Sequence, residues 1–182
     1  MSHKALEKLR QRFSSSIVET HDFRGDDTAV IQREALVEVV SWLREVHDLE
    51  LNMLTDMTAV DYLQQGHEPR FEVVYHLYSV ARKHRLRLKV QLAEEDPVVD
   101  SLCEQFKIAN WFEREIWDMY GIRFKGHPNL KRILLYEEFV GHPLRKDYPK
   151  ERRQPLLRRP ENEIAEVLAR RGKARSLPTA TE

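Results

Sequence analysis

The stretch EREIWDMYGIRFKGHPNLKRIL, residues 113–134, concentrates the side chains of this protein that could do chemistry. On a helix that begins near Trp111, residues three or four apart share a face, so Glu115 and Asp118 would lie close together. Two neighbouring carboxylates could hold a divalent metal or act as a general acid and base. With His127 they would form the site of a metal-dependent hydrolase.

The same charges could instead form ion pairs and helix caps. The acids could pair with nearby basic side chains such as Arg114 and Arg132, and charged runs near helix ends are commonly structural or interfacial. The spacing of His127 and His142, each followed by proline on irregular chain, gives a metal site no support. We therefore favour the structural interpretation.

A second charged block, PLRKDYP at residues 143–149, offers a similar choice. One interpretation is a phosphate-binding site. The other is a salt-bridged extended segment that lies on a partner protein. We favour the second, because Arg145 and Asp147 carry the fork-and-carboxylate chemistry that suits interfaces.

Motifs for bound cofactors are missing from the chain. Its six glycines include no G-x-G arrangement for a nucleotide loop. The single cysteine, Cys103, can neither ligate an iron–sulfur cluster nor form an internal disulfide. No H-E-x-x-H zinc motif or G-x-S-x-G elbow occurs. We therefore expect no catalytic, cofactor-binding or metal site in this chain.

Composition indicates a globular protein with a heavily charged surface: 41% of the 182 residues are apolar and 33% are charged. Lys plus Arg equals Asp plus Glu, at 30 each, so no global field indicates a nucleic-acid partner. No apolar run approaches the roughly 18 residues of a membrane helix. Residues 150–182 carry nine basic and five acidic residues, an asymmetry typical of a contact arm.

Hydrophobic periodicity predicts the elements that must position the charged blocks. Residues 85–92 alternate strictly between basic or polar and apolar side chains, the pattern of a strand with one buried face. The predicted elements before the charged blocks are a helix over 4–13, a hairpin of 17–23 with 27–33, a helix over 33–48, an extended segment over 51–63, and a hairpin of 71–80 with 85–92.

Local end signals predict two further helices. Asp96 followed by Pro97 is typical of a helix start, and the apolar residues after it recur at helical spacing. Asn110 with Glu113 has the spacing of a capping box, and Gly121 is suited to end that second helix. Beyond Gly121 the repeated prolines predict extended chain with one short strand over 132–136 and a short helix over 161–171.

These elements predict an α+β fold, with a mixed, hairpin-rich sheet and helices packed on one face, followed by a long extended C-terminal arm. We assign residues 1–122 to the core domain and residues 123–182 to the arm, which we expect to contact partner subunits.

The block at 113–134 resembles the signature of the 30 kDa-type (C-type) subunit of proton-translocating NADH:quinone oxidoreductase, respiratory complex I. GHPLRKDYP at 141–149 is similar to a second block of that family, and LTDMTAVDYL at 54–63 to a weaker third. The resemblance covers about residues 30–150. It implies structural or interfacial roles for the motif residues, which are Glu113, Arg114, Glu115, Asp118, Gly121, Phe124, Gly126, His127, Pro128, Leu130, Arg132, Leu134, Pro143, Arg145, Lys146, Asp147, Tyr148 and Pro149.

The resemblance implies a non-catalytic subunit in the hydrophilic arm of complex I, which passes electrons from NADH to quinone and translocates protons. FMN and the iron–sulfur clusters would belong to partner subunits, and this chain would dock on the quinone-site (D-type) subunit, which helps to shape the quinone pocket. It would lie peripherally at the cytoplasmic face of a bacterial inner membrane. The alternative is the equivalent subunit of a related membrane-bound hydrogenase or ferredoxin-type dehydrogenase complex.

Overall fold

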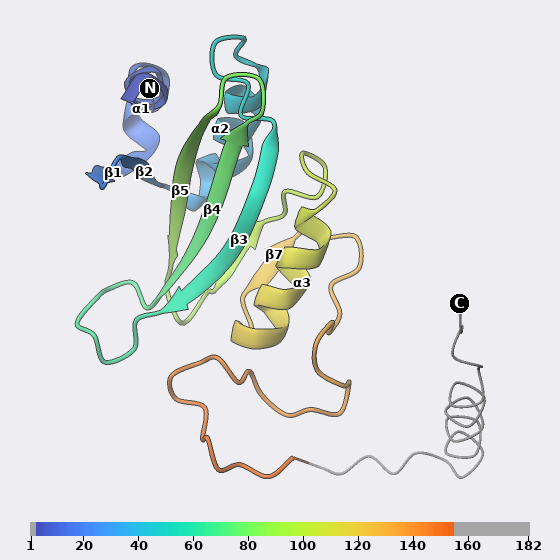
Figure 1. Ribbon diagram of the computed structural model, residues 1–182. Coiled ribbons are helices and arrows are strands. Elements are labelled where there is room, and N and C mark those ends of the chain that lie inside the picture. Colours follow the sequence, from blue (N-terminus) through green and yellow to red (C-terminus); the bar gives the residue numbers. More distant parts are fainter. Residues whose placement is uncertain (1–2, 155–182) are drawn as a thin grey trace, which may run out of the picture. The chain divides into compact units, whose positions relative to one another are not determined.

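Residues 3–154 are described by the computed structural model (Figure 1). The chain divides into two compact units, Met1–Arg152 and Arg153–Glu182, and all the helices and strands described belong to the first. That unit extends beyond residue 122, where the sequence placed the end of the core, and so includes the first part of the expected arm. The helix predicted over 161–171 lies outside the described residues.

A mixed five-stranded sheet is the framework of the first unit (Figure 1). Its strands follow the order β1-β2-β5-β4-β3, and β2 and β5 form its parallel pair. Both predicted hairpins are confirmed, and the extended segment becomes the edge strand β3. The bounds are β1 (Ile17–Phe23), β2 (Asp26–Ile31), β3 (Met53–Asp61), β4 (Phe71–Ser79) and β5 (His84–Leu92).

The alternating sequence of β5 determines which face of the sheet is buried. Its apolar residues, from Leu86 to Leu92, are each at most 1% exposed. Helices complete this core, through residues such as Leu9, Leu43 and Ile116. The predicted α+β fold with helices on one face is therefore confirmed. The helices are α1 (His3–Phe13), α2 (Leu36–Glu45) and α3 (Ala109–Tyr120), with 3-10 turns at Ser14–Ser16 and Arg33–Ala35.

The predicted helix after Asp96 is wrong. Its first residues form the short strand β6 (Val98–Asp100), which pairs in parallel with β7 (Arg123–Lys125). The amide of Arg123 donates to the carbonyl of Pro97 at 2.9 Å, which continues the pairing. Two adjacent β-branched valines favour a strand, and tertiary pairing outweighs the local helix-start signal here.

The strand predicted over 132–136 is also absent from the described structure, because residues 133–135 form a bend and the residues on either side are irregular. Amides in this run bind a side chain of α3 instead of another strand. Among residues 3–154, no helix combines the length and apolar character that a membrane crossing requires.

Candidate functional site

The three acids of α3 lie in different environments. Glu113 and Asp118 are fully buried, whereas Glu115 is exposed to solvent. Glu115 and Asp118 therefore do not share a buried site of the kind that a catalytic carboxylate pair would need.

The carboxylate of Asp118 organises the chain that follows β7. Its Oδ1 accepts a hydrogen bond from the guanidinium of Arg132, and its Oδ2 accepts from the backbone amides of Ile133, Leu134 and Leu135 at 3.1, 2.9 and 2.9 Å. Burial raises the pKa of Asp118, but these donors outweigh it and lower the pKa below its usual value. The carboxylate is thus an ionised anchor whose oxygens are already occupied.

Residues 131–149, which we call the anchor segment, also close the C-terminal end of α3. The carbonyls of residues 118–120 accept hydrogen bonds from Nδ1 of His142 at 3.0 Å, the amide of Leu144 at 3.1 Å and Nε of Arg145. These carbonyls have no partner inside the helix, and cations are favourable beside them. The second charged block is therefore the cap of the helix that carries the first.

Gly121 ends α3 as predicted, in a left-handed conformation with φ of +76°. The anchor segment adds a second constraint at this position. A Cβ atom on residue 121 would lie 2.6 Å from Nε2 of His142 and 2.9 Å from Nη2 of Arg145. Both the backbone angle and the close approach of the cap therefore require glycine.

Arg132 extends the network from Asp118 along the anchor segment. Its Nη2 donates to the carbonyls of Phe139 and Gly141 at 2.8 and 3.3 Å. Arg114, one turn before Asp118, donates to the carbonyls of Lys131 and Arg132 at 3.0 and 2.9 Å. The arginines thus fix the path of the backbone, because each guanidinium binds two carbonyls of an irregular loop.

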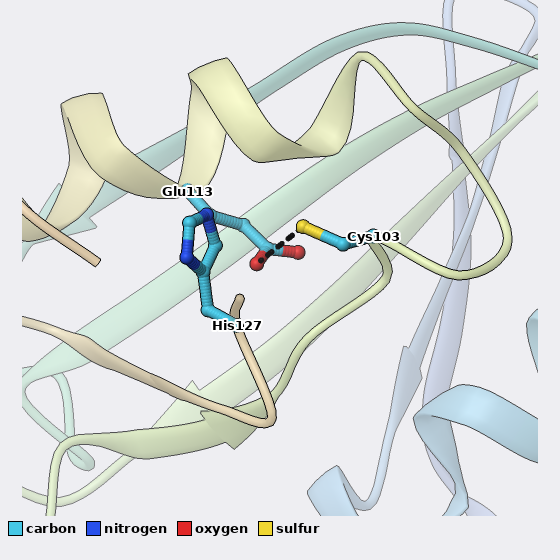
Figure 2. Close-up of side chains that lie close together, drawn as sticks. All are labelled: Cys103, Glu113 and His127. Atoms are coloured by element: carbon cyan, nitrogen blue, oxygen red, sulfur yellow. Dashed lines mark hydrogen bonds between the residues drawn. The ribbon is translucent and has the colours of Figure 1, made fainter. Parts of the chain in front are cut away.

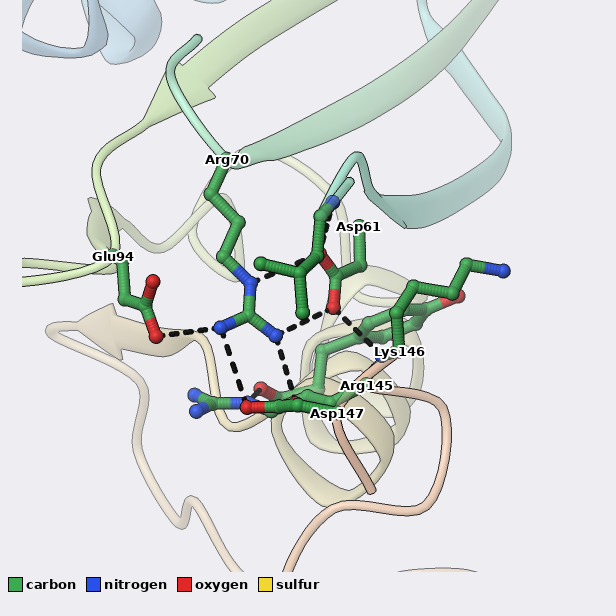
Figure 3. Close-up of polar contacts among 8 residues, drawn as sticks. Asp61, Arg70, Glu94, Arg145, Lys146 and Asp147 are labelled. Atoms are coloured by element: carbon green, nitrogen blue, oxygen red, sulfur yellow. Dashed lines mark hydrogen bonds and ion pairs between the residues drawn. The ribbon is translucent and has the colours of Figure 1, made fainter. Parts of the chain in front are cut away.

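A second ionic cluster, centred on the buried pair of Arg70 and Asp61, joins the anchor segment to the sheet (Figure 3). Arg70 is 8% exposed and donates to both carboxylate oxygens of Asp61 at 2.9 and 2.8 Å. It also donates to Asp147 at 2.8 Å and to Glu94. The amide of Lys146 completes the cluster by donating to Asp61 at 2.9 Å.

Arg70 was not predicted from the sequence. Asp61 lies in the weaker third block, but nothing near Arg70 in the sequence indicates a buried cluster. Its partner Asp147 is 77 positions away along the chain, a separation that local patterns cannot bridge. The one available signal was a charged residue directly before the apolar run that begins at Phe71.

The predicted capping box at the start of α3 is wrong. Glu113 accepts hydrogen bonds from the hydroxyl of Ser101 at 2.6 Å and the amide of Leu102 at 2.7 Å. Its carboxyl therefore holds the turn before the helix instead of the helix's own first amides, and the N-cap is Ile108 with no side-chain hydrogen bond. Burial raises the pKa of Glu113.

Cys103, Glu113 and His127 each offer a possible metal-ligand atom, and these atoms lie within 4.8 Å of one another (Figure 2). The Cys103 thiol donates to Glu113 at 3.5 Å. Burial raises the pKa of the Cys103 thiol to about 11. Nδ1 of His127 accepts from the amide of Asn129 at 3.0 Å, so Nε2 carries the proton that it donates to the carbonyl of Asn110 at 3.2 Å. A metal ion would have to displace these bonds, so this arrangement is suited to joining α3 to the chain after β7.

The remaining motif residues support the same arrangement. Phe124 is a buried residue of β7, Leu130 packs against the core, and the Tyr148 ring stacks on Phe139 with centroids 6.1 Å apart. Tyr148 also lies where a side chain on Gly141 would have to sit. Pro143 is half-buried, and the motif residues with greater exposure are Glu115, Gly126, Pro128, Leu134, Lys146, Asp147 and Pro149.

Comparison with known proteins shows that most of this chain matches one protein family. Residues 29–154 match the family model described as "Respiratory-chain NADH dehydrogenase, 30 Kd subunit". Two similar proteins are the C-type subunits of NADH-quinone oxidoreductase from Geotalea uraniireducens and Citrifermentans bemidjiense, 48% and 49% identical over 148 residues. The matches cover 81% of this chain and 88% and 89% of those relatives.

Two solved structures share the fold. The Nqo5 trypsin-resistant fragment (1–134) matches with a TM-score of 0.63 and 30% identity, covering 70% of this chain and 98% of the fragment. A chain of the archaeal membrane-bound sulfane sulfur reductase matches with a TM-score of 0.65 and 18% identity, covering 100% and 95% of the two chains. The second likeness is one of fold alone.

Asp118→Asn should destabilise the fold by about 3–5 kcal/mol, because Arg132 loses its counter-charge and the amide NH2 group faces backbone donors. Urea denaturation of the purified chain measures this change. Glu115→Gln, at the exposed acid of the same helix, should change the free energy of unfolding by less than about 0.5 kcal/mol. Equal stabilities of the two variants would contradict the anchoring role of Asp118.

Gly121→Ala should destabilise the chain by about 2 kcal/mol or more, from the left-handed backbone and the displaced cap. Gly66→Ala is the matched control, since Gly66 has φ of +67° with no atom within 4 Å of a built Cβ. Gly66→Ala should therefore lose only the stability that the left-handed backbone costs, about 1 kcal/mol. Thermal unfolding of both variants separates the two costs, and a Gly66 variant as unstable as the Gly121 variant would exclude the close-approach argument.

The Asp61–Arg70 pair should make stability depend on acid pH. Burial raises the pKa of Asp61, but hydrogen bonds from Arg70, Lys146 and Leu63 outweigh it and hold the pKa at about 2, below the ordinary value of 3.8. Because the folded-state pKa is depressed, this stabilisation is present above pH 3.8 and is lost as pH falls towards 2. It amounts to about 2 kcal/mol.

Urea denaturation at a series of pH values from about 6 down to about 2 measures this dependence. Asp61→Asn should be less stable than the wild-type chain at the upper end of this range and should show a smaller further loss in acid. Parallel pH profiles for the two proteins would rule out a contribution from Asp61.

Proposed function

Because the chain belongs to the 30 kDa subunit family of the respiratory-chain NADH dehydrogenase, we propose that it is a structural subunit of an NADH:quinone oxidoreductase complex. In this role it carries no step of the reaction. Its folded domain holds neighbouring subunits in position while they transfer electrons. Its relatives bear the name of that enzyme, which supports the assignment to the complex.

One observation carries the structural role: apart from the exposed Glu115, the charged motif residues that could have served in catalysis bind other residues of the chain. Asp118 accepts four hydrogen bonds, and the donors all come from residues 132–135. Arg145 caps α3, and Asp147 pairs with Arg70. A general acid or base needs a free lone pair or proton that faces substrate, whereas these groups face one another.

The partner and cofactor assignments follow from the family. We propose that the chain docks on the quinone-site (D-type) subunit, and that FMN and the iron–sulfur clusters belong to other subunits. The assembled complex would hold this chain peripherally at the cytoplasmic face of a bacterial inner membrane. The equivalent subunit of a membrane-bound hydrogenase or ferredoxin-type dehydrogenase remains the alternative, since the electron-input module lies in other chains.

Purification of the tagged chain from its native membranes in mild detergent tests this function. We expect NADH:quinone reductase activity and iron–sulfur absorbance in the eluate, and neither in the chain expressed alone. Mass spectrometry of the co-purified subunits distinguishes an NADH-oxidising module from a hydrogenase or ferredoxin module. A tagged chain that elutes from native membranes without other subunits would contradict the proposal.

A further inference from the structure

Glu115 is the acid of α3 that the interactions of residues 3–154 leave unused. The other two acids are buried and hydrogen-bonded, through Ser101 and Leu102 for Glu113 and through residues 132–135 for Asp118. Glu115 is exposed, and no hydrogen bond or ion pair within the described chain reaches its carboxylate. Because no bond within residues 3–154 occupies this motif acid, its carboxylate is available for contact with another molecule.

Two large apolar side chains lie on the same side of α3 as Glu115. Ile108 is 46% exposed and Trp111 is 59% exposed, and the spacing of three and then four residues places Ile108, Trp111 and Glu115 on one face of the helix. We call these three residues the α3 stripe. Burial of this exposed tryptophan and isoleucine against a partner would remove apolar surface from water, which favours association.

The Trp111 ring has an immobilised neighbour. The guanidinium of Arg114 lies 5.8 Å from its centroid and is itself fixed by the carbonyls of Lys131 and Arg132. Leu134, 62% exposed, adds an apolar side chain on the neighbouring anchor segment, where its amide binds Asp118. Because two carbonyls already hold Arg114, this side chain beside Trp111 loses little conformational entropy on binding.

We propose that the α3 stripe is a docking surface for a neighbouring subunit, which presents an apolar side chain to Trp111 and an Arg or Lys to Glu115. This inference rests on the proposed function and adds the contact face and the chemistry of the partner. Charge complementarity selects the partner: an exposed carboxylate without a counter-charge attracts a cation, and it repels the anionic headgroups of a membrane. Buried tryptophan and arginine are the residues that most often dominate such interfaces.

The test uses the full-length tagged chain in native membranes, with Trp111→Ala and Glu115→Lys as the stripe variants. The matched controls are Phe23→Ala, an aromatic residue 62% exposed on β1, and Glu45→Lys, an exposed acid on α2. We expect each stripe variant to recover about tenfold less NADH:quinone reductase activity and fewer co-purified subunits. The controls should match wild type, and all four thermal midpoints should stay within a few degrees of it.

Three other results would contradict the docking surface, and they differ in what they imply for the proposed function. Stripe variants that recover the complex at the wild-type level would overturn the docking surface and leave the proposed function intact. Stripe variants that lose the complex only because they unfold would assign the stripe to the fold, which also overturns it. A wild-type chain that recovers no complex would overturn the proposed function and this inference together.

Discussion

The buried carboxylate of Asp118 is the constraint on which the second half of the domain depends. A carboxylate loses its hydration when a helix carries it into the interior, and it is stable there only if charged and polar donors replace the water. Four donors from residues 132–135 do so. Because three of them are backbone amides, the chain at this point cannot continue a sheet, and its bends follow from the needs of a single side chain.

The rest of the anchor segment follows from that first contact. Once Arg132 is held at Asp118, its second nitrogen fixes the carbonyls of Phe139 and Gly141. The chain then reaches the end of α3, where His142 and Arg145 satisfy carbonyls that the helix leaves without partners. Each bond is modest by itself. Together they satisfy the polar groups of a long irregular segment, so a run rich in proline and charge can pack against a small domain.

Sequence patterns correctly predicted those elements whose conformation depends on neighbouring residues in the chain. The alternation in residues 85–92 predicted β5, and Gly121 predicted the end of α3, because side-chain alternation and the left-handed conformation of a glycine are local properties. The start signal at Asp96 failed because the pairing of Val98–Asp100 with Arg123–Lys125 decides that segment. The partners of Glu113 and Arg70 could not be predicted either, because they lie at distant positions in the sequence. A carboxylate near the start of a helix has the same local sequence whether it caps its own helix or holds a distant hydroxyl.

The position of the anchor segment after the sheet and α3 in the chain also has a consequence for biosynthesis. Translation produces Asp118 before Arg132 and the amides of residues 133–135, so the carboxylate of Asp118 first appears without its donors. Arg70 follows its partner Asp61 along the chain, but it lacks Asp147 until the anchor segment is made, and α3 receives its cap at the same stage. The domain is therefore built to reach its final form late in synthesis, and a ribosome that stalls before this segment would release a core with an uncompensated Asp118 and an uncapped α3.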